Sequence, residues 1–429
     1  MARAVDPPRA PVRGEIMPAF LRKPVLSDRG DGQTLAESGR GTGFMNDMAK
    51  APVIARPIPF IDLQAQRRRL GRAIEEGMER VLAHGQFIMG PEVAEFEAKM
   101  AAFCGAPHVI SCANGTDALK LALRAHGIGA GDAVIVPGFS FSASAEAVVI
   151  VGAAPVFCDV LEDSFNIDPA SIAKAAAAAR RAGFHPKAVM TVDLFGLPAD
   201  YPAIEAVAAS EGLIVVSDAA QSFGASLNGI DVGNFGAITA TSFFPSKPLG
   251  AYGDGGCLFT ADTEAASLLR SLRQHGEGKD RYDNVRIGVN SRLDSLQAAV
   301  LLAKLSIFAE EIEQRQLIAA RYNKALADVV EVPRVTNSAR SVWAQYTIKL
   351  VNRDKVQANL KAEGVPTAVY YPRSLHQQPA YLDFPEADGG LPVAESLSRR
   401  VLSLPFHPYL DAATQDYIVK KLRAAIAAP

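Results

Sequence analysis

The sequence predicts an α/β fold in which a mostly parallel sheet is covered by helices on both faces, followed by a smaller C-terminal α+β domain. From Phe60 onward, short apolar runs rich in β-branched residues alternate with stretches of helical periodicity. The chain has 429 residues and is 49% hydrophobic, which is enough apolar material to bury such a sheet. Because parallel strands are joined by crossover helices, this alternation is typical of a sheet with two covered faces.

The individual elements follow from these runs. The expected strands are His108–Ser111, Ala133–Pro137, Pro155–Val160, Ala188–Leu194, Leu213–Ser217 and Gly236–Phe244. The expected helices between them are Asp117–His126, Ser142–Val151, Ser171–Ala182 and Tyr201–Ser210. A longer helical segment, Arg292–Ala327, is expected to lead into the C-terminal part, where we expect a strand at Tyr346–Val351 and helices at Arg353–Glu363 and Asp411–Ala427. The chain is therefore divided into a large domain over residues 58–305 and a small domain over residues 306–429.

Composition limits the classes of protein that are possible. Residues 1–57 are rich in Pro, Gly, Arg and Asp without a sustained apolar period, so we expect a disordered N-terminal extension. The net charge of -2 and the pI near 6.4 do not favour a nucleic-acid partner. No apolar stretch reaches the roughly 18 residues of a membrane span, so a cytoplasmic protein without membrane contact is expected. The four cysteines lie far apart, which favours reduced thiols over a disulfide framework or a metal site.

An acid and a lysine follow two of the expected strands. Asp218 comes directly after Leu213–Ser217, and the ligands of parallel sheets bind at the carboxyl ends of strands. Lys247 follows Gly236–Phe244 in mostly apolar surroundings, where an amine loses its charge readily and can form a Schiff base. Each residue has an ordinary alternative: Asp218 as a helix N-cap and Lys247 as a solvated surface lysine.

A third motif, Ser111-Cys-Ala-Asn-Gly-Thr116, runs from a strand through Gly115 into a helix. Amide groups at a helix start, with the Thr116 hydroxyl beside them, form a phosphate cradle, although a plain N-cap is the alternative. A phosphate cradle, a strand-end acid and a strand-end lysine are the minimum set for pyridoxal 5'-phosphate (PLP). The acid keeps the ring nitrogen protonated, and the lysine holds the aldehyde and later moves a proton.

These motifs resemble the DegT/DnrJ/EryC1/StrS family of sugar-nucleotide aminotransferases, which have PLP fold type I. The resemblance covers roughly residue 58 to the C-terminus and rests on seven motifs in sequence order: Gly90-Pro-Glu, Asn114-Gly-Thr-Asp-Ala-Leu, Pro137-Gly-Phe-Ser-Phe, Asp218-Ala-Ala-Gln, Ser242-Phe-Phe-Pro-Ser-Lys, Gly253-Asp-Gly-Gly and Gly288-Val-Asn-Ser-Arg-Leu-Asp. It implies an enzyme that moves an amino group, in two half-reactions, from an amino acid, expected to be glutamate, to a nucleotide-linked keto-sugar.

The resemblance also assigns residues to the site. Lys247 matches the lysine that binds the cofactor aldehyde, and Asp218 matches the acid that faces the pyridine nitrogen. Further cofactor contacts are implied for Gly115, Thr116 and Ser242 at the phosphate, Phe141 on the ring face, Gln221 near the ring hydroxyl, and Asn290 at the phosphate of the neighbouring subunit. The position of Asn290 implies a homodimer with shared active sites. A lysine at position 247, where a minority of the family have histidine, favours amino transfer over dehydration.

Within the family, the chain most resembles bacterial enzymes that aminate the 3-oxo group of UDP-2-acetamido-2-deoxy-3-oxo-glucuronate on the way to surface polysaccharide. Arg292 matches an arginine that can hold the sugar carboxylate, with an interface salt bridge as its alternative. Tyr371 matches a substrate contact, whereas Tyr370 stands where those enzymes have histidine and carries no charge near neutral pH. Three other functions stay open: an aminotransferase for another nucleotide keto-sugar, such as a 4-keto-6-deoxy sugar, a PLP-binding sensor without turnover, and a cofactor-free sugar-nucleotide binder.

Overall fold

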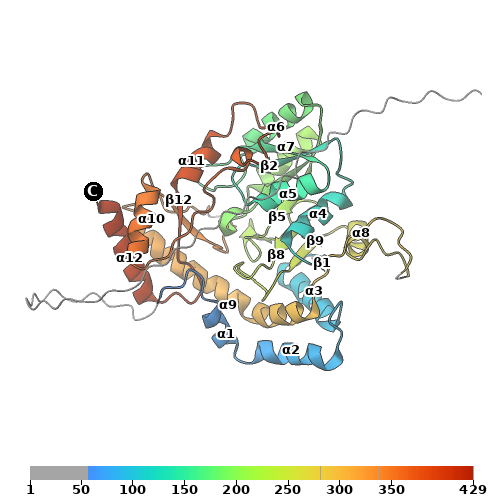
Figure 1. Ribbon diagram of the computed structural model, residues 1–429, viewed down its shortest axis with the longest axis horizontal. Coiled ribbons are helices and arrows are strands. Elements are labelled where there is room, and N and C mark those ends of the chain that lie inside the picture. The colour runs from blue at the N-terminus through green and yellow to red at the C-terminus, as the bar shows by residue number, and fades with distance from the viewer. Residues whose placement is uncertain (1–56, 281, 337, 429) are drawn as a thin grey trace, which may run out of the picture. The chain divides into compact units, whose positions relative to one another are not determined.

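The computed structural model describes residues 57–280, 282–336 and 338–428, and Figure 1 shows how their elements are arranged. The predicted disordered extension therefore lies outside the described residues, apart from Pro57. Three helices open the described chain: α1 (Leu63–Leu70), α2 (Ala73–His84) and α3 (Pro91–Cys104). None of the three was among the expected elements.

Seven strands form the main sheet, in the order β1-β9-β8-β5-β4-β2-β3. Their bounds are β1 (His108–Cys112), β2 (Asp132–Pro137), β3 (Ala154–Cys158), β4 (His185–Val192), β5 (Ile214–Asp218), β8 (Ile238–Ser242) and β9 (Gly256–Thr260). The pairs β2–β3, β2–β4, β4–β5 and β5–β8 are parallel, whereas β9 is antiparallel to both β1 and β8. The prediction of a mostly parallel sheet is confirmed. The unexpected β9 reverses direction because the chain returns from β8 through a loop rather than through a crossover helix.

Helices cover both faces of this sheet. On one face α3, α6 (Pro169–Arg181) and α7 (Tyr201–Glu211) pack against the strands, and on the other α4 (Gly115–Ala125), α5 (Ser142–Ile150) and α8 (Thr263–Arg273) do so. Strand β2 shows how the two cores are separated. Ala133 and Ile135 belong to the first apolar cluster, and Val134 and Val136 belong to the second, because successive side chains of a strand point to opposite faces.

The long helix α9 (Ser295–Leu326) connects this sheet with the C-terminal region, as Figure 1 shows. Leu301 and Phe308 pack in the first cluster of the sheet, whereas Tyr322 and Leu326 pack in a separate C-terminal cluster. That region contains the antiparallel pair β11 (Tyr346–Lys349) and β12 (Val401–Leu404) with the helices α10 (Arg353–Ala362) and α12 (Ala412–Ala427). The predicted domain boundary at residue 305 falls inside α9 and stays a prediction.

The remaining described elements are short: η1 (Leu194–Gly196), β6 (Ser226–Leu227), β7 (Ile230–Asp231), β10 (Ala339–Arg340), η2 (Leu375–Gln377) and α11 (Pro392–Arg400). All four cysteines are free and buried. Among the described residues, no cluster of His, Cys, Asp or Glu is arranged to hold a metal ion. No helix in the same part of the chain is long and apolar enough to cross a bilayer.

Candidate active site

Asp218 is the last residue of β5, at the carboxyl end of the parallel strands. Its side chain is buried and has two donors: the Ser144 hydroxyl donates to Oδ2 at 2.8 Å, and the N–H of Ala220 donates to Oδ1 at 3.1 Å. Burial raises the pKa of Asp218, whereas these hydrogen bonds and the positive charge of Lys247 lower it. A turn rather than a helix follows β5, so Asp218 is not a helix N-cap. A carboxylate in this position favours a cationic partner.

Lys247 lies in the loop that follows β8, and β8 is the neighbour of β5 in the sheet. The side chain is only partly accessible to solvent, and no hydrogen bond between described residues involves its Nζ atom. Burial lowers the pKa of Lys247, and the nearby Asp218 carboxylate raises it. The structure therefore brings the lysine and the acid into one electrostatic environment. Lys247 is therefore not a freely solvated surface lysine.

Gln221 and Tyr371 form the next part of the site. The Gln221 amide oxygen accepts the Phe195 N–H at 2.8 Å, and its amide nitrogen donates to the Tyr371 hydroxyl at 3.1 Å. Burial raises the pKa of Tyr371, so this hydroxyl stays protonated. The ring of Phe141 lies 6.2 Å from the Tyr371 ring and is 54% exposed. An exposed aromatic ring at the edge of a sheet can stack on a planar ligand. Tyr370 lies beside Tyr371, with ring centroids 5.9 Å apart.

Gly115 and Ser242 meet at the start of α4. A Cβ atom on Gly115 would lie 2.6 Å from Ser242 Cβ, so only glycine permits this approach. Asn114 is the N-cap of α4, since its Oδ1 accepts the Asp117 N–H at 2.8 Å. The N–H groups of Gly115 and Thr116 belong to the first turn, where helices leave donors without intrahelical partners. These donors and the Ser242 hydroxyl form a small anion site of the kind that binds phosphate.

Asn290 and Arg292 lie apart from these groups, on the segment that leads into α9. No hydrogen bond among the described residues joins either side chain to Asp218 or Lys247. Asn290 is exposed, while the Nε atom of Arg292 is buried without a hydrogen-bond partner in the part of the chain that the structure describes. Ser291, between them, accepts the Ala113 N–H at 3.1 Å and so joins this segment to the loop before Gly115.

Two residues of the site were missed by the sequence analysis. Ser144, the donor to Asp218, lies three positions after Phe141 on the first turn of α5. Asp193 directly follows β4 and is fully buried, and burial raises its pKa to about 7. Polar residues at strand ends are the first candidates in such sheets. Asp193 was not recognised as a strand-end residue because the predicted strand, Ala188–Leu194, extended past it.

These residues fit PLP. Asp218 supplies a buried carboxyl group for the ring nitrogen, and Lys247 supplies an amine whose pKa is lowered by burial. The start of α4 with Ser242 supplies donors for a phosphate, and Phe141 supplies a free aromatic face. The sheet and the site together define the class of the protein: a PLP-dependent aminotransferase of fold type I.

Residues 69–423 match the DegT/DnrJ/EryC1/StrS aminotransferase family, and the chain belongs to this family. It is 50% identical, over 85% of its length and 99% of the relative, to the UDP-2-acetamido-2-deoxy-3-oxo-D-glucuronate aminotransferase of Pseudomonas aeruginosa. It is 42% identical, over 85% of its length and 97% of the relative, to a protein of Geobacillus stearothermophilus named pleiotropic regulatory protein. It is 45% identical, over 82% of its length and 94% of the relative, to the UDP-N-acetyl-3-dehydro-alpha-D-glucosamine 3-aminotransferase of Acidithiobacillus ferrooxidans.

Solved structures agree with this assignment. A DegT/DnrJ/EryC1/StrS aminotransferase from Brucella abortus is 52% identical and superposes with a TM-score of 0.85, over 86% of this chain and all of that chain. NtdA from Bacillus subtilis, whose structure contains the bound cofactor PMP, is 29% identical with a TM-score of 0.79, over 89% of this chain and 87% of that one. The predicted fold, enzyme class and PLP cofactor are confirmed. The roles of individual residues stay predictions.

Proposed function

We propose that this enzyme transfers an amino group from glutamate to the 3-oxo group of UDP-2-acetamido-2-deoxy-3-oxo-glucuronate, for the synthesis of a surface polysaccharide. The convergence of Asp218 and Lys247 at the end of neighbouring strands carries the amino-transfer part of this proposal. The 50% identical relative that acts on this sugar supports the substrate. Because the thiols are free and the substrate is a nucleotide sugar, we place the reaction in the cytoplasm.

The chemistry follows from the placement of the side chains. PLP supplies an electron sink that stabilises negative charge on the carbon next to the amino nitrogen. Asp218, held by the Ser144 hydroxyl and the Ala220 N–H, would be the acid that holds the proton on the ring nitrogen. Lys247 Nζ would be the amine that holds the cofactor aldehyde, and once free it would carry the proton that moves during amino transfer. The hydrogen bond from Gln221 to Tyr371 orients both side chains, and Gln221 would contact the ring hydroxyl of the bound cofactor.

Arg292 is the proposed partner of the sugar carboxylate. Its guanidinium is partly buried, and the Nε atom has no hydrogen-bond partner among the described residues. A buried donor without a partner is costly, which favours a ligand that supplies an acceptor. A planar guanidinium matches a carboxylate with two parallel hydrogen bonds. Tyr370 and Tyr371 are proposed to contact the sugar through their hydroxyl groups.

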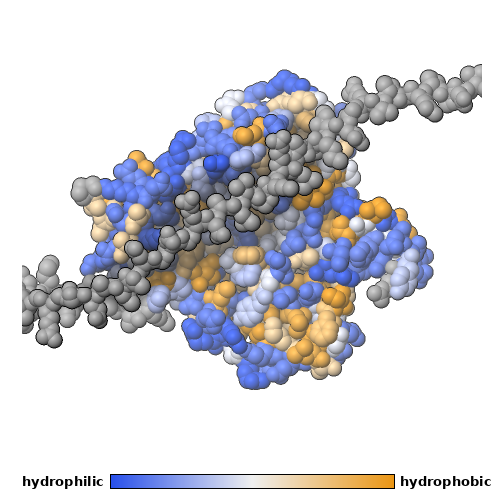
Figure 2. Space-filling view, viewed as in Figure 1, coloured by the Kyte–Doolittle hydropathy of each residue, from blue (hydrophilic) through white to orange (hydrophobic). Residues whose placement is uncertain are grey.

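We also propose a homodimer in which Asn290 reaches the cofactor phosphate of the neighbouring subunit. Apolar side chains are exposed on two segments beside it: Phe87, Ile88 and Met89 at 45%, 45% and 36%, and Ile287 at 83%. The Phe87 carbonyl accepts the Ser295 N–H at 2.9 Å, so the first segment lies next to the start of α9. Figure 2 shows hydrophobic residues gathered at the lower edge of the face in view, in the region where α2 and α3 meet. Exposed apolar patches of this kind mark interfaces.

A coupled assay tests the proposed reaction. The purified enzyme is given glutamate and one of three acceptors: the UDP-linked 3-oxo-uronate, its neutral 3-oxo counterpart, or a 4-keto-6-deoxy nucleotide sugar. Formation of 2-oxoglutarate with the uronate, and its loss in Lys247→Ala, is the expected result. If the wild-type protein binds PLP but produces 2-oxoglutarate only with another sugar, the substrate is wrong. If it binds PLP and turns over none of the three, a binding role without turnover replaces the proposal.

The neutral 3-oxo sugar is the second candidate, since a 45% identical relative is named for it and Tyr370 carries no positive charge. Arg292→Gln separates the two candidates. If Arg292 holds a carboxylate, this variant raises KM for the uronate by about tenfold or more and leaves KM for the neutral sugar nearly unchanged. Equal effects on both sugars would remove Arg292 from carboxylate recognition.

A further inference from the structure

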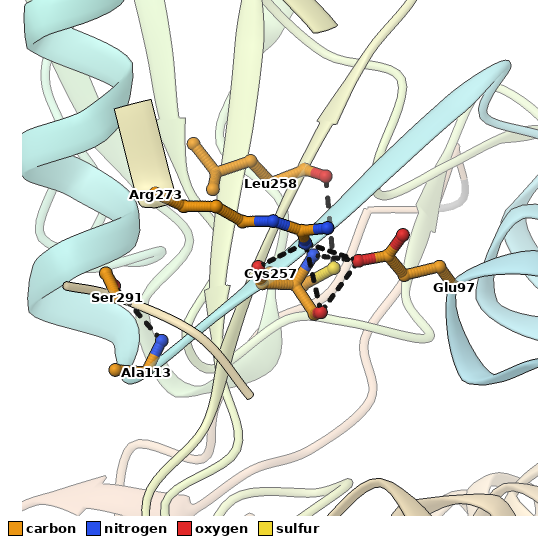
Figure 3. A network of polar contacts seen from close by, with 7 residues as sticks. Glu97, Ala113, Cys257, Leu258, Arg273 and Ser291 are labelled. Atoms are coloured by element: carbon orange, nitrogen blue, oxygen red, sulfur yellow. Dashed lines mark hydrogen bonds and ion pairs between the residues drawn. The ribbon is translucent and has the colours of Figure 1, made fainter. Parts of the chain in front are cut away.

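A buried ion pair contacts β1, the strand that leads into the start of α4. Figure 3 shows Glu97 and Arg273 pointing toward each other, with Ser291 beside Ala113. Arg273 Nη1 lies 2.5 Å from Glu97 Oε1, and the two side chains are only 5% and 16% exposed. Glu97 comes from the middle of α3, and Arg273 is the last residue of α8. The pair therefore joins two helices that are far apart in sequence.

Both members of the pair form hydrogen bonds with Ser111 in β1, two residues before Ala113. The N–H and the hydroxyl of Ser111 donate to Glu97 Oε1 at 2.8 and 2.7 Å. Arg273 Nη1 donates to the Ser111 carbonyl at 2.7 Å. Every polar group of this residue thus contacts the pair. Since the backbone of Ser111 is held from both directions, the strand end that leads to Gly115 has little freedom to move.

The backbone of Arg273 also holds the segment that contains Asn290 and Arg292. Its carbonyl accepts the Ser291 N–H at 2.9 Å, and the Ser291 hydroxyl in turn accepts the Ala113 N–H at 3.1 Å. The preceding carbonyl, of Leu272, accepts the Val289 N–H at 2.8 Å. The described parts of this segment, residues 275–280 and 282–290, are largely exposed, and they begin and end at the same helix terminus that carries the arginine.

We propose that Glu97 and Arg273 are a positioning pair. The pair fixes the phosphate cradle of its own subunit relative to the Asn290–Arg292 segment, which contributes to the active site of the neighbouring subunit. This inference rests on the proposed function, because it assigns PLP phosphate to the cradle and the segment to a shared site. The pair does not touch the cofactor. It acts through Ser111, Ala113 and Ser291, so that a change at the pair alters both sites of a dimer.

The first test measures cofactor affinity, by titrating the cofactor-free protein with PLP and following its absorbance. Glu97→Gln keeps the shape but removes the anion, and we expect the PLP dissociation constant to rise by about tenfold or more. Arg273→Met should do the same. Arg273→Lys should largely restore binding, because the hydrogen bonds of Arg273 to Glu97 and Ser111 all use Nη1, and an ammonium has three donors. Glu95→Gln, on the same helix but in an exposed pair with Lys99, is the matched control.

Thermal melting of the cofactor-free variants separates positioning from general stability. A purely structural pair would lower the melting temperature and leave PLP affinity unchanged well below it. If the wild-type protein binds PLP at Lys247 and Glu97→Gln binds PLP with the same affinity, this inference is overturned while the proposed function stands. Absence of PLP binding at Lys247 in the wild-type protein would instead overturn the proposed function.

The second test uses mixed dimers with one working active site. One subunit is wild type, and the other carries Lys247→Ala with or without Glu97→Gln. The working site then has a wild-type cradle and receives its Asn290–Arg292 segment from the altered subunit. We expect Glu97→Gln to raise KM for the nucleotide sugar by about tenfold, although it lies in the inactive subunit. An identical KM in the two mixed dimers would show that the pair does not position the shared segment.

Discussion

Asp193→Asn removes a buried carboxyl group that holds its proton more tightly in the folded protein than in the unfolded chain. The pKa of Asp193 is raised from 3.8 to about 7, mainly because the carboxyl group is buried. Hydrogen bonds from Ala199, Ser222 and Tyr201 act in the opposite direction, and the nearby Asp218 adds to the increase. Asparagine has the same shape. Its oxygen can still accept from the Ala199 N–H and the Tyr201 hydroxyl, while its amide donates to the Ser222 hydroxyl, which rotates to accept.

The sign of the effect follows from the protons bound by each state. Below pH 3.8 the carboxyl group is protonated in both states, and its stabilising contribution is fully present. As pH rises from 3.8 to about 7, the unfolded chain gives up this proton while the folded protein keeps it, so the free energy of unfolding falls and levels off once the folded carboxyl group also ionises. At 1.36 kcal/mol per pKa unit, the shift corresponds to at most about 4 kcal/mol. The stability of Asp193→Asn relative to the wild-type protein therefore increases by up to that amount between pH 4 and pH 8.

Urea unfolding of the cofactor-free proteins at several pH values measures this difference, with protein concentration held constant. Asp200→Asn is the matched control, since Asp200 is an exposed N-cap on the following helix, and asparagine caps equally well. The control should show no such increase. A difference for Asp193→Asn that stays flat, or that falls as pH rises, would refute the account of this carboxyl group.

Three further substitutions test the site. Asp218→Asn should keep PLP binding but lower kcat at least about 100-fold, since the ring nitrogen loses its anionic partner; near-normal turnover would remove Asp218 from the mechanism. Ser144→Ala removes a donor that lowers the pKa of Asp218, so the acidic limb of the pH–rate profile should move to higher pH, and an unmoved limb would contradict this coupling. Gly115→Ala places a Cβ atom 2.6 Å from Ser242 Cβ and should weaken PLP binding by about tenfold or more, whereas Gly129→Ala meets only ordinary contacts and should bind normally.

The parts of the fold that the sequence predicts are those with continuous apolar runs. Strands β2 and β5 are largely buried on both faces and contain the unbroken apolar runs Ala133–Pro137 and Ile214–Val216, and their limits were predicted to within a residue. Strand β9 was missed, because a run of only five residues is too short for its periodicity to identify a strand. The predicted strand over β4 ran to Leu194, since apolar residues flank Asp193 and conceal the strand end.

The site was predictable where a residue type and its place in the fold both point to chemistry, as for Asp218 and Lys247. Contacts between residues that are far apart in the sequence could not be predicted from it. Ser144 and Asp218 are 74 positions apart, and Glu97 and Arg273 are 176 apart. Each residue alone is compatible with an ordinary surface or core role, and only the packing of α5 on the sheet, or of α3 and α8 against β1, brings the partners together. Residues that position others therefore became visible only in the structure.

Reduction of the PLP-loaded enzyme with borohydride, followed by mass spectrometry of its peptides, tests the central claim most directly. The reduction fixes the cofactor carbon to the lysine nitrogen that binds it. We predict that the label is found on Lys247. Lys304 provides an internal comparison, because it is fully buried and burial lowers its pKa to about 8, but its Nζ donates to the Gly250 carbonyl at 2.6 Å. Label on Lys304, or on no lysine of a folded protein that binds PLP, would contradict the account.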